Sequence, residues 1–322
     1  MKKESGYYRS RKGSGFTYTN ERGRTIISKP IRTWIESLAI PPAWTEVWIS
    51  KDRAAYMLAT GRDQKNRKQY IYHPDWTTLR EEKKFLRLLA LGQSLQKIRR
   101  RLHKKLQQKA LSKDRVLAAV VSMIDQTGAR VGSEAYTKEN GSYGVTTVRK
   151  KHVSGARTKL FSYIGKSGQE RELVVDDPLV VQVIRDCEDT AGFEVFKYFN
   201  EDGVKQVVTS DEVNEFIRKI SGVAVTAKDF RTWYGTSEAL KKCITLGTCG
   251  VDKKAVQSKL IFKHAASALG NTPKIAEASY VHPLVVELYF ANKLPKLSLQ
   301  ASKYLEVEEA TLIKILEAHM ET

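Results

Sequence analysis

The chain of 322 residues contains 55 lysines and arginines against 36 aspartates and glutamates, a formal net charge of +19. This length accommodates one large domain or two smaller ones, and the excess of cations implies a polyanionic partner rather than an ordinary metabolite. Nucleic acid fits better than an anionic membrane, because no run approaches about 18 apolar residues and the basic stretches are interleaved with Gln, Tyr and Gly. We therefore expect binding to nucleic acid and no membrane association.

The N-terminal residues 1–24 are rich in Lys, Arg, Gly, Ser and aromatics and lack the apolar segment of a secretory signal. They predict a cytosolic protein that begins with a basic, flexible arm able to lie along phosphates, although a merely disordered leader fits equally well. The cysteines Cys187, Cys243 and Cys249 form no C-x-x-C pair, so we expect them to be reduced and structural.

A small β-rich domain is predicted over residues 1–80. The segments 47–49 and 69–72 are rich in β-branched and aromatic residues, and Pro41-Pro42 marks a turn before them. The remainder, residues 81–322, is expected to form a second, mainly α-helical domain.

That second domain opens with a predicted helix over 79–111, in which Leu95, Ile98, Leu102 and Leu106 form one buried face. Its other face and the residues that follow it carry nine cations against the single acid Asp114: Lys97, Arg99, Arg100, Arg101, Lys104, Lys105, Lys109, Lys113 and Arg115. Such a run repels itself unless an anion lies nearby, which favours phosphate contacts over a merely solvated charged face.

The next segment is predicted to be a helix with Asp114 as N-cap and Gly128 as C-cap, so that Arg130 lies just past its end. Three short strands are expected at 144–149, 158–164 and 171–175, with Lys166 at a hairpin tip. Further helices follow, with N-caps at Thr209, Thr226 and Thr272. The predicted fold class is α+β: a small β-rich N-terminal domain and a mainly α-helical catalytic domain with a three-stranded β meander.

Four residues far apart in this sequence form the set that a phosphate-transferring tyrosine needs: Tyr280, Arg130, Lys166 and Arg231. A phenol with a pKa of about 10 is a weak nucleophile at neutral pH, so fixed cations must stabilise the phenoxide and the charge developing on phosphorus. Taken singly, each residue has an ordinary interpretation as a surface cation, a turn lysine or a packing aromatic. Asn271 is either part of a turn or a donor to a phosphate oxygen.

Other chemistries lack their sequence signatures. The chain has neither a G-x-x-x-x-G-K-[ST] loop nor a G-x-G-x-x-G fingerprint, and its six histidines are scattered without H-E-x-x-H spacing. We therefore predict no cofactor and no metal.

Several ordered segments of this sequence resemble the type IB DNA topoisomerases, specifically their small poxvirus-like and bacterial branch. The likeness covers residues 15–282 and includes IPPAWTEVWI, ATGRDQKNRKQYIYHP, GARVGSEAYTKENGSYGVTTVRKKHV, YIGK, KDFRTW and LGNTPKIAEASYVHP. It implies that Tyr280 forms a 3′-phosphotyrosyl intermediate, that Lys166 and Arg130 help expel the 5′ hydroxyl, and that Arg130 and Arg231 bind the transition state. The poxvirus-like members carry His at the position of Asn271, whereas the bacterial branch carries Asn, as this chain does.

The resemblance also implies a clamp around duplex DNA, relaxation of supercoils without ATP or metal, and monomeric action without an obligate protein partner. Further DNA contacts are predicted for three tyrosines beside basic residues, although packing explains each of them almost as well. The predicted DNA-binding residues are Tyr70, Tyr72, Tyr136, Arg67, Lys68, Arg99, Arg100 and Lys104.

Two other functions remain open at this point. A tyrosine site-specific recombinase uses a similar Arg, Lys, Arg and Tyr set, but usually shows H-x-x-R where this chain has Lys228 to Arg231, and its N-terminal domain is helical. A noncatalytic basic DNA-binding module would explain the charge but not the ordered motifs.

Overall fold

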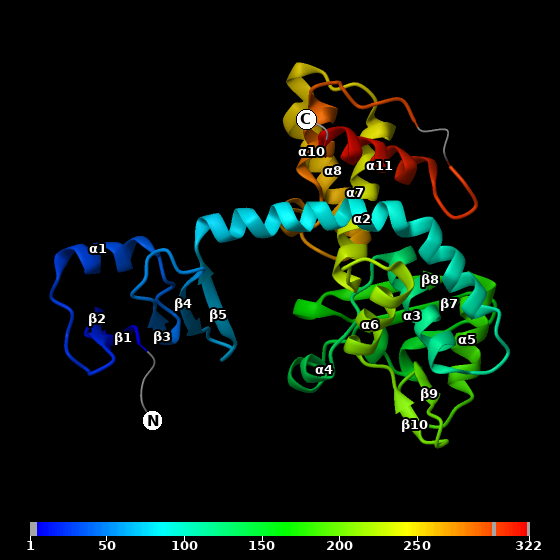
Figure 1. Ribbon diagram of the computed structural model, residues 1–322, viewed down its shortest axis with the longest axis horizontal. Helices are drawn as coiled ribbons and strands as arrows, with labels where there is room; N and C mark the ends of the chain where they lie inside the picture. Colours follow the sequence, from blue (N-terminus) through cyan, green and yellow to red (C-terminus); the bar gives the residue numbers. More distant parts are fainter. Residues whose placement is uncertain (1–4, 298–300, 321–322) are drawn as a thin grey trace. The chain divides into compact units, whose positions relative to one another are not determined.

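The computed structural model describes residues 5–297 and 301–320, which divide into two compact units, Met1–Lys84 and Phe85–Thr322 (Figure 1). We predicted a boundary at residue 80. The division falls inside the helix α2 (Pro74–Leu106), which begins in the first unit and continues into the second. No helix among the described residues is both long and apolar enough to cross a membrane.

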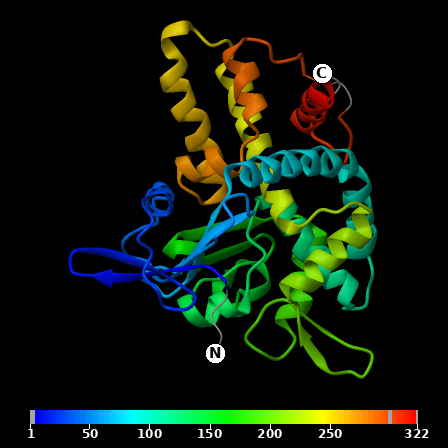
Figure 2. The ribbon, with the colours of Figure 1, turned by 60° about the vertical axis from the view of Figure 1, so that its left-hand side comes forward.

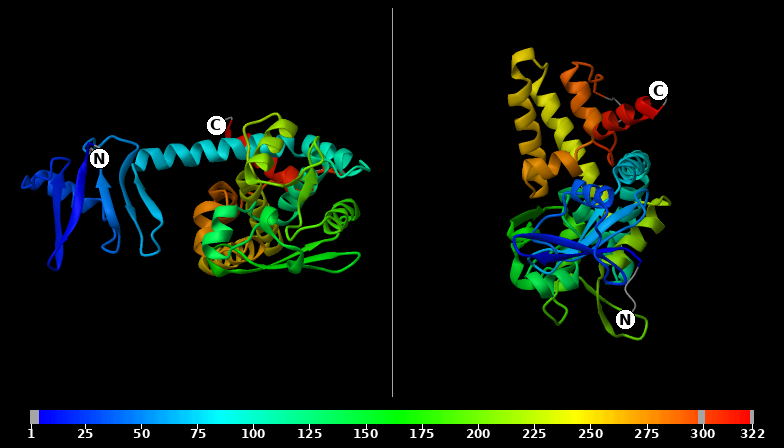
Figure 3. Two further views of the ribbon diagram at one scale, coloured as in Figure 1. Left: turned by 90° about the horizontal axis from the view of Figure 1, so that it is seen from below. Right: turned by 90° about the vertical axis from the view of Figure 1, so that its left-hand side faces the viewer.

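The first unit is a five-stranded antiparallel sheet with one helix, α1 (Lys29–Ser37), and the strand order is β2-β1-β3-β4-β5 (Figure 3). Val47 and Ile49 point into its core while Trp48 between them is only half-buried, as the period of two along a strand requires. The strands are β1 (Tyr7–Lys12), β2 (Gly15–Asn20), β3 (Thr45–Ile49), β4 (Met57–Arg62) and β5 (Lys68–Tyr72). The two strands predicted at 47–49 and 69–72 are therefore confirmed.

The prediction of a flexible basic arm over residues 1–24 is wrong for residues 5–24, which the structure describes. Strands β1 and β2 pair along their whole length, Tyr18 is buried, and Arg9 donates to the carbonyl oxygens of Ile40, Pro41 and Trp44. Alternating aromatic residues around a Gly-Ser-Gly turn are a hairpin signal that the basic composition of this segment masked. Residues 1–4 lie outside the described residues.

The second unit is mainly helical, with a three-stranded antiparallel sheet in the order β6-β7-β8 (Figure 2), so the predicted α+β class is confirmed. Its elements after α2 are α3 (Lys113–Thr127), α4 (Glu134–Asn140), β6 (Val153–Ser154), β7 (Lys159–Ile164), β8 (Glu170–Val175), α5 (Pro178–Glu188), β9 (Lys197–Phe199), β10 (Lys205–Val207), α6 (Ser210–Ser221), α7 (Ala227–Leu246), α8 (Lys254–Leu269), α9 (Pro273–Ser279), α10 (Pro283–Phe290) and α11 (Val307–Met320).

The predicted apolar face of α2 is confirmed, because Leu95, Ile98, Leu102 and Leu106 are all buried. The helix ends at residue 106 rather than 111. The N-cap of α3 is Ser112, whose hydroxyl accepts a hydrogen bond from the backbone N–H of Arg115, and not Asp114. Asp114 lies instead in the first turn of α3 and forms an ion pair with Lys105 at 2.8 Å.

The first of the three predicted strands, 144–149, is also wrong. Val145–Thr147 forms a 3-10 turn, and its backbone N–H groups bind the loop that carries Arg130: Val145 donates to the carbonyl of Arg130 at 2.9 Å and Thr146 to that of Val131 at 2.7 Å. These bonds replace a strand ladder. The first strand of the meander is instead the short β6, whereas β7 and β8 lie where they were predicted.

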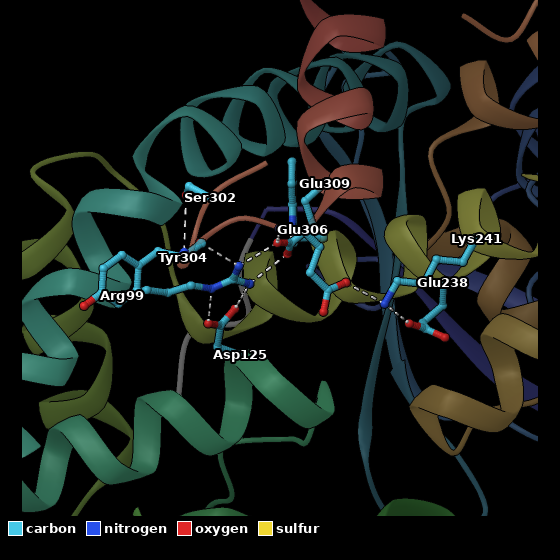
Figure 4. Close-up of polar contacts among 9 residues, drawn as sticks. Arg99, Asp125, Glu238, Lys241, Ser302, Tyr304, Glu306 and Glu309 are labelled. Atoms are coloured by element: carbon cyan, nitrogen blue, oxygen red, sulfur yellow. Dashed lines mark hydrogen bonds and ion pairs between the residues drawn. The ribbon is translucent and has the colours of Figure 1, made fainter. Parts of the chain in front are cut away.

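Four of the nine cations of the basic run, Arg99, Lys105, Lys113 and Arg115, form ion pairs inside the second unit rather than a free phosphate-contacting face. Arg99 is the clearest case: it lies between two carboxylates, with Nε 2.7 Å from Asp125 and Nη1 2.6 Å from Glu309 (Figure 4). Lys113 pairs with Glu212 and Arg115 with Asp186. For these four cations the partner anions are side chains of the protein. The two ion pairs engage the guanidinium of Arg99 and disfavour its predicted DNA contact, which stays a prediction.

Candidate active site

The C-terminus of α8 organises the site. Gly270 ends this helix with a left-handed φ of +58°, and the carbonyl groups of Ala268 and Leu269 in its last turn accept hydrogen bonds from arginines on other elements. Asn271 follows directly, and the N-cap Thr272, whose hydroxyl accepts from the N–H of Ile275, starts α9 as predicted. Helix α9 (Pro273–Ser279) is only seven residues long, and Tyr280 follows it directly.

Arg231 lies on α7, whose predicted capping box at Thr226 is present. The side chain is buried, with Nη1 donating to the carbonyl of Gly128 and Nη2 to that of Leu269 at 3.3 Å. Its guanidinium carbon lies 5.0 Å from the centroid of the Tyr280 ring. The cation predicted to assist the phenol is thus beside it.

Arg130 lies two residues past Gly128, which is the C-cap of α3 with φ +58°, as predicted. Its Nη2 donates to Oδ1 of Asn271 at 2.5 Å. The Nδ2 of Asn271 is consequently directed elsewhere, and it is buried without a hydrogen-bond partner among the described residues, as is Nε of Arg231. A bound anion would supply the acceptors that these two buried N–H donors lack.

Tyr280 is the C-cap of α9, and its backbone is fixed to α7. Its carbonyl accepts from the hydroxyl of Thr236 at 3.1 Å, and the same hydroxyl accepts from the N–H of His282 at 3.1 Å. A Cβ at Gly235 would lie 3.0 Å from the carbonyl oxygen of Tyr280 and 2.7 Å from the side chain of Leu269. Gly235 therefore allows the tyrosine to approach α7 closely.

Lys166 occupies the tip between β7 and β8, as predicted, and its side chain is exposed. Its Nζ lies 5.9 Å from the ring centroid of Tyr136. Both residues line a cavity of about 390 Å³ together with Tyr280. The cations that line this cavity are Arg130, Lys166, Lys228 and Arg231, and no carboxylate is among its lining residues. The structure thus brings the predicted Arg, Lys, Arg and Tyr set into one place, with Asn271 behind Arg130.

The electrostatics of the cavity favour a negative occupant. Burial, and next the neighbouring Arg130, lower the pKa of Arg231 to about 10. Burial alone would raise the pKa of the Tyr280 phenol, but Arg231 and then Arg130 outweigh it, so that this pKa lies below the ordinary value. The site therefore stabilises the phenoxide of Tyr280 relative to that of a free tyrosine and is suited to a phosphodiester anion.

The predicted DNA contacts of the first unit gather on β5. Tyr70 is exposed, stacks on Tyr72 with ring centroids 5.8 Å apart, and lies under Nζ of Lys68 at 5.7 Å. Arg67 pairs with Asp63 at 2.7 Å. In the second unit Tyr136 is exposed on α4, and Arg100 and Lys104 are exposed on α2 without an ion pair among the described residues. Contact of these residues with DNA stays a prediction.

Sequence reasoning missed several residues around the tyrosine. Gly235 inside a helical pattern was a usable signal, because glycine in a helix interior often marks a close approach. Thr236 and Lys228, which lies beside Tyr280 in the cavity, gave no signal that distinguishes them from ordinary helix residues. Arg171, buried behind the site, was also missed.

Comparison with known proteins agrees with this geometry. Residues 66–284 match the family described as the catalytic core of eukaryotic DNA topoisomerase I, and residues 15–63 match the N-terminal domain of bacterial DNA topoisomerase IB. DNA topoisomerase 1B of Acanthamoeba polyphaga mimivirus is 31% identical over 299 residues, covering 89% of this chain and 88% of that protein. DNA topoisomerase 1B of vaccinia virus (strain Copenhagen) is 22% identical over 286 residues, covering 86% of this chain and 87% of that protein.

These matches and the mixed α+β fold define an isomerase that acts on DNA, a DNA topoisomerase. The chain belongs to the type IB DNA topoisomerases, and DNA is its partner.

Proposed function

We propose that this enzyme relaxes supercoiled DNA through one transient nick. The phenolic oxygen of Tyr280 attacks a backbone phosphorus, the bond from phosphorus to the 5′ oxygen breaks, and a 3′-phosphotyrosyl linkage forms. Religation is the reverse step, after the free end has rotated. The observation that carries the proposal is the position of the Tyr280 ring beside Arg231, in a cavity lined by four cations and no carboxylate.

Each cation has a separate task in this proposal. Arg231 stabilises the phenoxide and, with Arg130, the charge on the pentavalent phosphorus, since a guanidinium grips two phosphate oxygens at once. Lys166 protonates the departing 5′ oxygen from the exposed hairpin tip. Asn271 holds Arg130 through Oδ1 and offers its unpartnered Nδ2 to a nonbridging oxygen.

The reaction is a pair of transesterifications, so the covalent link to Tyr280 conserves the energy of the phosphodiester. Relaxation consequently needs no ATP, and the charge stabilisation that a metal ion would otherwise supply comes from arginine and lysine side chains. We further propose that the enzyme acts in the cytosol, as a monomer on duplex DNA.

The test is relaxation of negatively supercoiled plasmid in EDTA without ATP, read as topoisomers on a gel. Three proteins are compared: the wild type, Tyr280→Phe, and the matched control Tyr289→Phe. The hydroxyl of Tyr289 is buried on α10 without a hydrogen-bond partner in the described part of the chain, so its removal leaves no group unpaired.

We expect relaxation by the wild type and by Tyr289→Phe but not by Tyr280→Phe, and a covalent protein–DNA adduct in the same two samples only. Relaxation by Tyr280→Phe would overturn the assignment of the nucleophile. An adduct without relaxation of random plasmid would favour the site-specific recombinase.

A further inference from the structure

Arg171 is a buried cation behind the active site. Strand β8 alternates exposed and buried residues, and Arg171 lies on its inward face with Leu173 and Val175. An arginine at a core-facing position is costly unless it is paired. Among the described residues, however, no carboxylate forms an ion pair with Arg171, whereas Arg115, which is equally buried, pairs with Asp186 at 2.6 Å.

The contacts of Arg171 join two parts of the catalytic machinery. Its Nη2 donates to the carbonyl of Ala268 at 3.3 Å, in the last turn of α8. Its guanidinium packs so closely on Gly270, one residue before Asn271, that a Cβ at Gly270 would overlap it. The stem of the side chain packs on Gly165, one residue before Lys166, where a Cβ would lie 3.1 Å from Cγ of Arg171.

The end of α8 therefore receives two arginines side by side. Arg171 binds the carbonyl of Ala268 and Arg231 that of Leu269, while Arg130 binds the side chain of Asn271 just beyond. The negative end of the helix dipole offsets part of the cost of burying these charges. Of the three arginines, Arg171 alone comes from the hairpin that carries Lys166, and it does not line the cavity.

We propose that Arg171 is a positioning residue that ties the Lys166 hairpin to the C-terminus of α8 and so sets Lys166 within reach of the departing 5′ oxygen. This inference rests on the proposed function. In the step concerned, the Tyr280 oxygen bonds to phosphorus, the phenol proton passes to water, the bond from phosphorus to the 5′ oxygen breaks, and Lys166 delivers a proton to that oxygen. Arg171 is not among the residues that line the cavity around Tyr280, and its phenol partner is Tyr163 on the neighbouring strand β7.

The test uses two DNA substrates that differ in one atom at the cleavage site, an ordinary 5′ bridging oxygen or a 5′ bridging sulfur. A thiolate is a far better leaving group than an alkoxide and needs no proton, so the sulfur substrate reports everything except proton delivery. Single-turnover rates of covalent adduct formation are measured on both for the wild type, Lys166→Ala, Arg171→Met, Arg171→Lys and Arg115→Met.

We expect Arg171→Met to cleave the oxygen substrate roughly 10- to 100-fold more slowly than the wild type, within the range for general acid catalysis, and the sulfur substrate at nearly the wild-type rate. Lys166→Ala should show the same pattern more strongly. Arg171→Lys keeps the charge but lacks the planar guanidinium, so its rate on the oxygen substrate should lie between those of the wild type and Arg171→Met. It provides a second test if Arg171→Met does not fold. Arg115→Met removes an equally buried arginine elsewhere and should leave both rates per folded molecule unchanged.

Equal slowing of Arg171→Met on both substrates, or no slowing on the oxygen substrate, would overturn the positioning role. The wild type decides the proposed function separately: if it forms no adduct on either substrate, the proposed function fails, and this inference fails with it.

Discussion

Two arginine clusters in the second unit use the same side chain for opposite purposes. Arg99 is held between Asp125 and Glu309, and Glu309 also accepts from the indole N–H of Trp233 at 3.0 Å (Figure 4). Around Tyr280, by contrast, the partners of Arg130 and Arg231 among the described residues are an amide, backbone carbonyls and Tyr280 itself, and none is a carboxylate. The first cluster satisfies its own charge and fastens α11 to α2 and α3. The second leaves positive charge for an anion that the protein does not contain.

The largest expected effect breaks the first cluster. Arg99→Met leaves Asp125 and Glu309 buried without their cation, and removal of one member of a buried ion pair costs about 3–5 kcal/mol. Chemical denaturation should show that loss in the free energy of unfolding, while the cleavage rate per folded molecule stays near the wild-type value. The neighbouring Arg100→Met should change stability by less than about 0.5 kcal/mol, because Arg100 is exposed. Equal stability of the two variants would contradict the structural role of Arg99.

The reverse pattern is expected for the second cluster. Arg231→Met removes a donor aimed at developing charge, which should slow cleavage by about 10²–10³-fold. The free energy of unfolding should fall by less than for Arg99→Met, because the groups that lose their donor are two backbone carbonyls and not buried carboxylates. Single-turnover cleavage and denaturation of the same preparation give both numbers.

Arg218→Met, an exposed arginine on α6, is the control and should alter neither quantity. If Arg231→Met lost stability as severely as Arg99→Met does, the contrast between the clusters would not hold.

The contrast also marks what sequence could and could not predict. Local signals were sufficient for the C-cap at Gly128, the N-caps at Thr209, Thr226 and Thr272, and the hairpin tip at Lys166, since each depends on residues within a few positions. Arg99 could not be interpreted locally. Its partners are 26 and 210 residues away in the chain, so the basic run around it appeared unpaired.

Long-range contacts explain the other differences as well. The segment 144–149 has the β-branched composition of a strand, but two of its backbone N–H groups donate hydrogen bonds to the carbonyls of Arg130 and Val131 instead of to a neighbouring strand. The catalytic set was predicted from a resemblance and from the needs of a phenol nucleophile. The supports of that set, Thr236 and Arg171, act through backbone contacts that no spacing in the sequence reveals.

A smaller effect should appear in the pH dependence of cleavage. Phenoxide is the attacking form, and Arg231 and Arg130 hold the pKa of Tyr280 below its ordinary value. The rate of adduct formation on the sulfur-bridged substrate should therefore rise with pH and level off below a pH of about 10, the pKa of a free tyrosine. Arg231→Met removes the largest favourable interaction with phenoxide, so its plateau should move to higher pH, whereas Arg218→Met should follow the wild-type profile. A profile of Arg231→Met that matches the wild type would show that Arg231 does not act on the phenol.

The smallest effect tests whether the remaining free cations of α2 meet DNA. Arg100 and Lys104 are exposed and have no ion pair among the described residues, whereas Arg101 on the same helix donates to the carbonyl of Ile220 at 2.6 Å. A side chain that contacts a phosphate releases a counterion when it binds, so Arg100→Ala and Lys104→Ala should each reduce the slope of log affinity against log salt by about 1. Binding is measured with Tyr280→Phe as background, which separates affinity from cleavage.

Arg101→Ala is the matched control because its guanidinium is already engaged, and its slope should stay that of the background. Slopes of all three variants equal to that of the background would mean that neither Arg100 nor Lys104 contacts phosphate. In that case the whole basic run would resemble the Arg99 cluster, and the contrast between the two uses of positive charge would be confined to the cavity around Tyr280.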